Sequence, residues 1–356
     1  MPFKESKNNL KSQGVDFLTN LHAKPLINFI RYCRHLNLNV IERIIKSNTF
    51  LRTSVKNKII DLFINGNTKF THLYIPRRFN YKIHLIPGTE YCFSKLEFLS
   101  CNTCITNNAL NRLTEICKSI KELELIEIIN SNYRIVKLIE VPKRLLNVRL
   151  ITVNCKIDIS FYGILEDSLT KQANTVQDFI INKYPIPKIL SSFVNLKRLE
   201  LGCSNFTTVT TWNYLEDLSL PFLETLKTKN VPFRGLISLI ENTKGYLTEI
   251  NIGYVHQLLN DEIDNKRIIQ VISQNCPNLK YLKLLITNNN ILELEKLLIK
   301  CQYLEGLFFI ASMNFFYGGY IFDWDSLFEV LVKSSPINLF KFKFYFREAP
   351  KLESLK

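Results

Sequence analysis

Few residues in this sequence could do chemistry, and the closest approach to a ligand set is the pair Cys101-x-x-Cys104. Two cysteines at this spacing supply half of a structural zinc site, which needs four ligands, and no second pair follows at the distance typical of a zinc finger. Cys101 also stands at an apolar position of a leucine pattern, where a free thiol behaves as a small buried hydrophobe. We therefore expect Cys101 to belong to the core, and we expect no bound metal.

Catalytic motifs are missing from the sequence. His72 and His84 are expected in a strand and a loop, and the pattern places no acid or nucleophile beside either of them. The chain has no HExxH, GxSxG, GxxxxGK[ST] or GxGxxG motif, and only 11 of its 356 residues are the glycine that phosphate-binding loops require. We expect a protein that is not an enzyme, with no catalytic residue and no cofactor.

The apolar residues carry the clearest signal. The stretch CPNLKYLKL begins at Cys276, and CQYLEGLFF repeats its spacing 25 residues later, at Cys301. Both contain the pattern apolar-x-x-apolar-x-apolar, which recurs along the chain at the intervals typical of leucine-rich repeats. The clear instances are Phe70-Leu73-Ile75, Leu96-Leu99-Cys101, Ile120-Leu123-Leu125, Leu145-Val148-Leu150, Val176-Phe179-Ile181, Leu196-Leu199-Leu201, Leu247-Ile250-Ile252, Leu279-Leu282-Leu284, Leu304-Leu307-Phe309 and Leu339-Phe342-Phe344.

One region is ambiguous, because Leu215-Leu218-Leu220 and Leu223-Leu226-Thr228 both fit the pattern. They are too close together for two full repeats, and the sequence does not choose between them.

Several instances of the leucine pattern follow a segment whose apolar residues are spaced as on one face of a helix. These segments include NALNRLTEIC, NKRIIQVISQNC and ELEKLLIKC. Each of these helices ends at a cysteine, and we expect Cys117, Cys276 and Cys301 to pack at the joint between helix and strand. Stacked units of this kind predict an α/β leucine-rich-repeat solenoid, with parallel strands on its concave side and helices on its convex side. We expect it to be irregular, because the position where such repeats carry an Asn holds Cys104, Ile128, Val153 and Thr287.

The residues that flank the core positions of each strand are expected to face outward on the concave wall. Those of the last three repeats are apolar, aromatic and basic, a composition typical of protein-binding surfaces. We predict a partner-binding site at Tyr281, Lys283, Leu285, Phe308, Ile310, Lys341, Lys343 and Tyr345, with Gly306 in the middle row. A covering C-terminal segment is the alternative. The earlier rows are mixed: Glu122, Glu124 and Ile126, and Arg198, Glu200 and Gly202. At the last strand we expect Phe342 and Phe344 to face the core, and we expect Phe344 and Phe346 to be more exposed than Leu282 or Leu307.

The formal net charge of +14 is concentrated near the start, where residues 1–60 hold 11 Lys and Arg against 3 Asp and Glu. A solvated helical surface explains this charge, and no nucleic-acid-binding motif accompanies it. The nine cysteines fall within leucine patterns rather than in a disulfide framework, which indicates a reducing compartment, the cytoplasm or the nucleus. No run approaches the ~18 apolar residues of a membrane helix, so we expect no membrane partner.

The N-terminal part reads as a polar tail, residues 1–24, and a helical cap, residues 25–66, ahead of the repeats at 67–356. Three apolar stripes predict three helices in the cap. They are Leu26, Phe29, Ile30 and Cys33; Val40, Ile41, Ile44 and Ile45; and Val55, Ile59, Leu62 and Phe63.

Five stretches of the sequence are distinctive: CPNLKYLKL, LLIKCQYLEGL, FDWDSLFEVLVKSSPINLFKFKF, LISLIENTKGYLTEI and LNLNVIERII. Through them the sequence resembles the F-box/leucine-rich-repeat proteins, in particular a large expanded fungal family of them. The resemblance covers about residues 24–356. It implies a substrate-recognition subunit of an SCF-type cullin–RING ubiquitin ligase, which docks through its F-box on a Skp-type adaptor.

The chain departs from that family at its start. Only 24 residues precede Pro25, and they contain no leucine-proline start, so we expect the F-box to be absent or truncated and adaptor binding to be weak or missing. The sequence thus leaves three hypotheses. The first is a ligase recognition subunit or a truncated relative, the second is a ligase-independent protein-binding scaffold, and the third, which we do not favour, is a nucleic-acid-associated protein.

Overall fold

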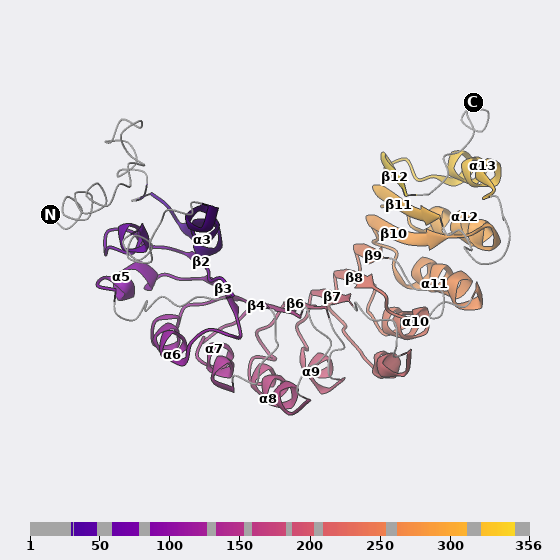
Figure 1. The fold of residues 1–356 in the computed structure, drawn as a ribbon. Coiled ribbons are helices and arrows are strands. Elements are labelled where there is room, and N and C mark those ends of the chain that lie inside the picture. Colours follow the sequence, from indigo (N-terminus) through magenta and orange to yellow (C-terminus); the bar gives the residue numbers. More distant parts are fainter. Residues whose placement is uncertain are drawn as a thin grey trace, which may run out of the picture. The chain divides into compact units, whose positions relative to one another are not determined.

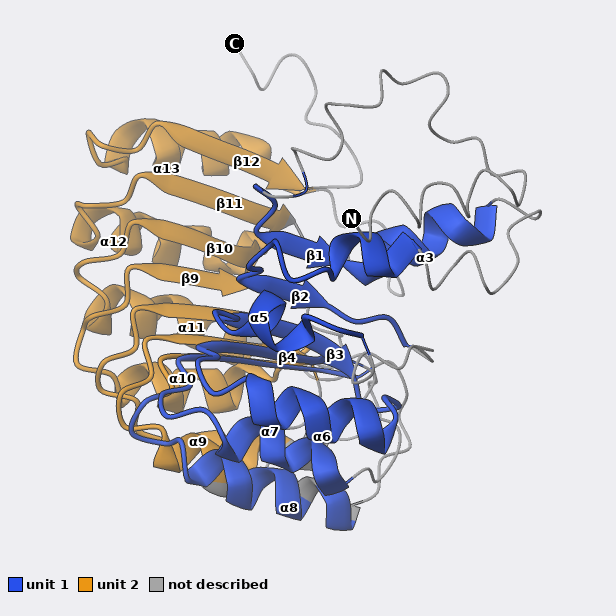
Figure 2. Cartoon of the chain, turned by 90° about the vertical axis from the view of Figure 1, so that its left-hand side faces the viewer, with its two compact units in different colours: residues 1–175 blue, residues 176–356 orange. Residues whose placement is uncertain are grey.

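The computed structural model describes residue 30 and residues 32–47, 59–77, 86–126, 133–152, 159–182, 187–202, 209–253, 262–311 and 322–345. The chain divides into two compact units, unit 1 at residues 1–175 and unit 2 at residues 176–356 (Figure 2). In each unit parallel strands alternate with helices or 3-10 turns. The prediction of an α/β chain with parallel strands is therefore confirmed.

In unit 1 the strands lie side by side in chain order, and each pairs in parallel with the next. They are β1 (His35–Asn37), β2 (His72–Tyr74), β3 (Phe98–Asn102), β4 (Glu122–Ile126) and β5 (Asn147–Ile151). The helices are α3 (Leu38–Ser47), α5 (Thr89–Phe93), α6 (Asn107–Ile116), the 3-10 helix η2 (Tyr133–Val136), α7 (Lys137–Glu140) and α8 (Ile159–Thr170). Figure 1 shows α6, α7 and α8 along one side of these strands.

Unit 2 is built in the same way. Its strands are β6 (Asp178–Ile181), β7 (Arg198–Gly202), β8 (Thr225–Lys229), β9 (Glu249–Ile252), β10 (Tyr281–Ile286), β11 (Gly306–Ala311) and β12 (Lys341–Tyr345). Its helices are α9 (Pro187–Ser192), η3 (Val209–Leu215), α10 (Phe233–Glu241), α11 (Glu262–Asn275), η5 (Asn288–Asn290), α12 (Ile291–Lys300) and α13 (Trp324–Ser334). Helices α10 to α13 lie along one side of the sheet, and each contacts the next (Figure 1).

One backbone hydrogen-bond motif repeats where most of the strands begin. The amides of Glu305 and Gly306 both donate to the carbonyl of Lys280, over 2.8 and 3.0 Å. The same shared acceptor occurs at the start of β3, where Glu97 and Phe98 donate to Thr71. Because two N–H groups are fixed by one carbonyl of the preceding strand, the register of each new strand is set at its first residue.

The leucine pattern coincides with the strands. The second apolar residue of each clear instance lies inside a strand, and nearly all of these residues are fully buried, as Leu282 and Leu307 are. The ambiguous region is resolved in favour of the later instance, because β8 contains Leu226 and Thr228. Leu215, Leu218 and Leu220 are buried as well, but they lie in η3 and the loop after it.

The predicted N-terminal cap contains more than helices. Helix α3 and the helical residues 59–63 correspond to two predicted helices, whereas Leu26 and Phe29 of the first stripe lie outside the described residues. Between them the chain forms β1, with Leu36 paired in register to Leu73 of β2. This strand was not predicted, although Cys33-x-x-Leu36-x-Leu38 fits the leucine pattern. The buried side of α3 also differs from the predicted stripe, since Val40 and Ile44 are exposed.

The cysteines at the ends of α6, α11 and α12 are buried as predicted. The backbone amides of Cys117, Cys276 and Cys301 each donate to the helix carbonyl four residues earlier. The Cys301 thiol also donates to the Cys276 carbonyl over 3.6 Å, so corresponding joints of successive repeats touch. Burial raises the pKa of the Cys276 thiol, and it raises that of Cys301 to about 11. These thiols therefore pack as apolar groups.

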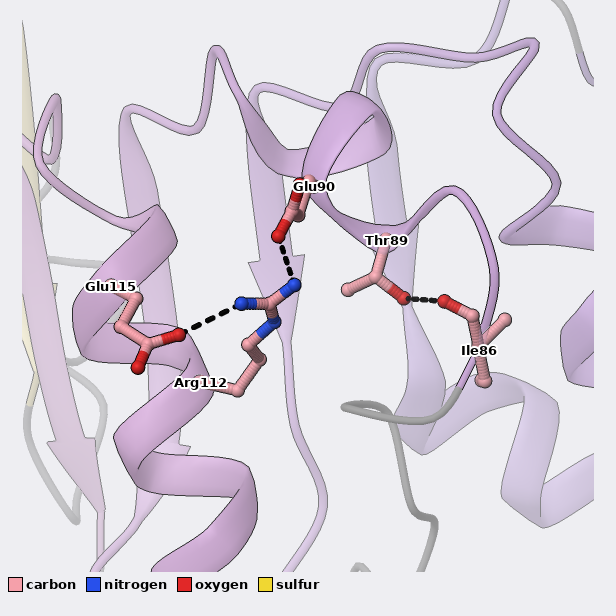
Figure 3. Close-up of polar contacts among 5 residues, drawn as sticks. All are labelled: Ile86, Thr89, Glu90, Arg112 and Glu115. Carbon is pink, nitrogen blue, oxygen red and sulfur yellow. Dashed lines mark hydrogen bonds and ion pairs between the residues drawn. The ribbon is translucent and has the colours of Figure 1, made fainter.

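On the helical side of unit 1, surface ion pairs link neighbouring helices. Arg112 of α6 is bonded to Glu90 of α5, and it also donates to Glu115 of its own helix over 2.8 Å (Figure 3). Beside them the Thr89 hydroxyl donates to the Ile86 carbonyl over 2.7 Å. Such exposed pairs contribute little to stability, roughly 0–1 kcal/mol each. We assign this cluster to the scaffold.

None of the helices among the described residues combines the length and the apolar character that crossing a bilayer would need.

Candidate functional site

The outward positions predicted for the last three repeats are brought together on three neighbouring strands of unit 2, which Figure 1 shows side by side. Parallel pairing sets β11 in register with β10 on one side and with β12 on the other. The resulting rows are Tyr281–Gly306–Lys341, Lys283–Phe308–Lys343 and Leu285–Ile310–Tyr345. These nine residues are called the β10–β12 patch.

Burial confirms the predicted phase of these strands. Leu282, Leu284 and Leu307 are buried, whereas Lys283 and Phe308 between them stay partly exposed. Successive side chains of a strand point to opposite faces, so one face of β10 and β11 belongs to the core and the other is free to make contacts.

Leu285 departs from this phase. It lies in register with Ile310, but its exposed fraction is only 8%. The alternation of β10 stops at Leu284, because Leu284, Leu285 and Ile286 are all buried. Leu285 therefore offers little surface to a partner, contrary to the expectation for this residue.

The Tyr281 side chain lies over the neighbouring strand β11 and does not extend away from the sheet. Its hydroxyl donates to a carboxylate oxygen of Glu305 over 2.6 Å, and this hydrogen bond raises the pKa of the Tyr281 hydroxyl. A Cβ added at Gly306 would lie 2.8 Å from Cδ1 of the tyrosine ring, closer than side chains pack. Glycine at this position thus lets the ring lie over β11, which makes the ring a fixed part of the patch.

The basic residues of the patch are not neutralised within it. Lys341 places Nζ 5.7 Å from the centre of the Phe308 ring, a weak cation–π contact. Lys283, Lys341 and Lys343 form no ion pair within the part of the chain that the structure describes. The patch therefore joins an aromatic centre to uncompensated positive charge.

The last strand has a less complete core than its neighbours. Phe342 was expected to face the core, but its exposed fraction is 41%, whereas that of Leu307 in the same row is 0%. Phe344 is partly exposed and packs against Phe309, Trp324 and other rings. The prediction that Phe344 is more exposed than Leu282 or Leu307 is confirmed, and Phe346 lies outside the described residues. No described element covers β12 on its far side, which explains the exposure of Phe342.

The earlier rows also face outward, and one charged residue in each of them, Glu124 and Arg198, has a partner of opposite charge on a neighbouring strand. In unit 1 the Ser100 hydroxyl donates to Glu124 over 2.7 Å, and Arg149 lies 3.6 Å from the same carboxylate. In unit 2 Arg198 lies 3.5 Å from Asp178 on the neighbouring strand. Neither row combines exposed aromatic surface with unpaired charge.

No protein-family model and no curated protein matches this sequence. The candidate site therefore stands on its own residues.

The cysteine pair considered as half of a zinc site is split by the fold. Cys101 is fully buried in β3 and Cys104 is exposed. Burial raises the pKa of the Cys101 thiol to about 12, which disfavours the thiolate that a metal would need. Within the described ranges, no three His, Cys, Asp or Glu side chains gather as a metal site would require.

A row of rings on the sheet of unit 1 was not predicted. The imidazoles of His35 and His72 stack with centroids 3.8 Å apart, and Phe98 continues the row 5.4 Å from His72. Tyr74 packs beside Phe98 at 5.0 Å. The row depends on β1, so recognising Cys33-x-x-Leu36-x-Leu38 as a repeat would have revealed it. His84, the other histidine considered for catalysis, lies outside the described residues.

Proposed function

We propose that this protein is a leucine-rich-repeat protein that binds another protein through the β10–β12 patch. The observation that carries the proposal is the register of the three strands, which joins Tyr281, Phe308 and Ile310 to three lysines on one face. Aromatic residues with a polar or charged rim are the composition of binding hot spots. The regular spacing of buried leucines and the shared backbone acceptor at the start of most strands support the repeat family.

The role that best fits such a surface is capture of a target rather than its chemical conversion. The resemblance to F-box/leucine-rich-repeat proteins makes the captured partner a substrate of an SCF-type cullin–RING ubiquitin ligase, in the cytoplasm or the nucleus. In that arrangement a Skp-type adaptor and a cullin would join through an F-box, and other subunits would supply catalysis.

A second candidate is a ligase-independent scaffold, and one observation favours it. Residues 35–47, within the segment that was expected to be a helical cap, form β1 and α3, and β1 pairs with β2 as the other strands pair. A strand and helix of this kind extend the array of paired strands, which supports a structural role for this segment rather than an adaptor-binding one.

The binding proposal is tested by a double variant, Phe308→Ala with Ile310→Ala, used as bait beside the unchanged chain in the native cell type. The matched control is Tyr303→Ala, an exposed aromatic residue just after α12. Partners that the unchanged chain and the control retain but the double variant loses support the proposal. Identical partner sets for all three baits contradict it.

The two candidates are separated by calorimetry with a purified Skp-type adaptor. Binding in the micromolar range or tighter supports the ligase role, and the absence of heat supports the scaffold.

A further inference from the structure

The lysines of the patch belong to a larger imbalance of charge on the same face. Along β8 to β12 the outward positions hold five lysines and one acidic residue, Glu249. Glu249 forms an ion pair with Lys227, with 2.9 Å between the charged atoms. The remaining lysines, Lys229, Lys283, Lys341 and Lys343, make no ion pair with a described residue. The nearest other acid, Glu305, is engaged by Tyr281 and by Lys280, so it is not available to them.

Like charges gathered on one face repel each other, so they weaken the fold unless something of opposite charge binds there. We propose that the β10–β12 patch takes an extended acidic protein segment that also carries apolar side chains, an inference that rests on the proposed function. Its carboxylates pair with Lys283 and Lys343, and its apolar side chains contact Phe308 and Ile310.

The spacing of the lysines fits such a segment. Lys283 and Lys343 lie in the same row on either side of Phe308, two strand spacings or roughly 10 Å apart at the backbone. A polyproline-II segment rises about 3.1 Å per residue with three residues per turn, so residues i and i+3 stand on one side about 9 Å apart. Acidic residues at that interval meet both lysines, and the residues between them are turned by about 120° from that side, so their apolar side chains contact Phe308 and Ile310 beside the acidic row.

A nucleic acid offers the same negative charge but fits the face less well. Outward positions on β8 to β12 contain no arginine, the residue that binds phosphate through two parallel hydrogen bonds. Ile310 supplies an aliphatic contact, and Tyr281 has its hydroxyl committed to Glu305. An apolar peptide side chain uses these contacts better than a base does.

The test measures fluorescence anisotropy of labelled probes with the full chain. The probes are a repeat of Glu-Pro-Leu, its Ser-Pro-Leu counterpart, and an oligothymidylate of similar length. We expect the acidic peptide to bind at least about tenfold more tightly than the serine peptide, and we expect binding to weaken as salt rises from about 0.05 to about 0.5 M.

The variant Lys283→Glu with Lys343→Glu should weaken binding of the acidic peptide by at least about tenfold, and Lys283→Met with Lys343→Met should weaken it by less. The control, Lys95→Glu with Lys118→Glu, makes the same change of net charge at exposed positions of unit 1 and should leave affinity within about twofold. Equal binding of the acidic and serine peptides, equal losses in variant and control, stronger binding of the oligonucleotide, or no peptide binding would each overturn the acidic partner. The proposed function fails separately, if the Phe308 and Ile310 variant keeps every cellular partner.

Discussion

The row around Glu124 in unit 1 and the β10–β12 patch in unit 2 hold equivalent outward positions of their strands but treat charge in opposite ways. In unit 1 Glu124 is satisfied by Ser100 on one neighbouring strand and lies near Arg149 on the other, and the rings of His35, His72 and Phe98 cover one another. In unit 2 the β10–β12 patch leaves three lysines beside an aromatic centre without a described acidic partner.

The difference supports our proposal that the β10–β12 patch, and not every outward face of the strands, binds a partner. Outward positions whose charges are matched within the sheet gain stability from one another and have little to offer a partner. Positions with unmatched charge and exposed rings contribute little to folding, so their composition is better explained by binding. The contrast would be wrong if the patch stabilised the fold, or if the row around Glu124 in unit 1 did not.

The largest expected effect separates the core of β10 from its outward face. Leu282→Ala should lower the free energy of unfolding by ~2–5 kcal/mol, because removing a fully buried leucine side chain leaves a cavity. Lys283→Ala, one residue away on the opposite face, should cost under ~0.5 kcal/mol.

Denaturant melts followed by two probes measure both values, since arrays of repeats need not unfold in a single step. Equal losses for the two variants would mean that Lys283 is structural, which removes the reason to treat the patch as a binding surface.

A smaller effect is expected at Glu124 in unit 1. Glu124→Ala should lower the free energy of unfolding by about 1–2 kcal/mol, because the buried Ser100 hydroxyl loses its acceptor. Glu124→Gln keeps an acceptor and should lose under about 1 kcal/mol, since it removes only the attraction to Arg149.

The same two-probe melts compare Glu124→Ala with Lys283→Ala. If the lysine variant is the more destabilised of the two, the contrast between matched and unmatched rows is wrong.

Much of the fold follows from the spacing of apolar residues, because a strand flanked by others must bury every second side chain. That requirement placed β2 to β7 and β9 to β12, and it predicted which residues of β10 and β11 face outward. The spacing could not show whether Leu218 or Leu226 lies in a strand, since both are buried and only the position of the next helix distinguishes them. It missed β1 because the helical stripe of α3 begins at once after it.

The site was predicted by position but not in its details. The place of Tyr281 over Gly306 depends on a missing Cβ in the next strand, and the burial of Leu285 depends on what covers the end of β10. The first is a contact between two successive repeats, which the pattern within one repeat does not display. The lack of acidic partners for Lys283 and Lys343 is likewise a property of neighbouring strands, which no single repeat displays.

The smallest expected effect is a pH dependence confined to the ring stack of unit 1. Burial and the adjoining charge of His35 lower the pKa of His72, while Glu122 and Glu97 partly oppose the shift. A lowered pKa means that the unfolded chain takes up the proton more readily than the folded chain does. The contribution of His72 to stability is therefore complete above its ordinary pKa of about 6.5, and it declines as pH falls from there toward the lower folded value.

We therefore expect hydrogen exchange at β1 and β2 to quicken relative to the amides of β10 as pH falls from about 7.5 to about 5.5, after correction for the intrinsic rate. His72→Gln should remove most of this change because the titrating group is gone, and its hydroxyl neighbour Thr71 keeps a possible partner. His35→Gln should reduce the change, since it removes the charge that lies 3.8 Å away between ring centres, but it leaves the contribution of burial in place. A pH response that is equal in β1 and β10, or that survives His72→Gln unchanged, would show that the stacked histidines do not distinguish the strands of unit 1 from those of unit 2.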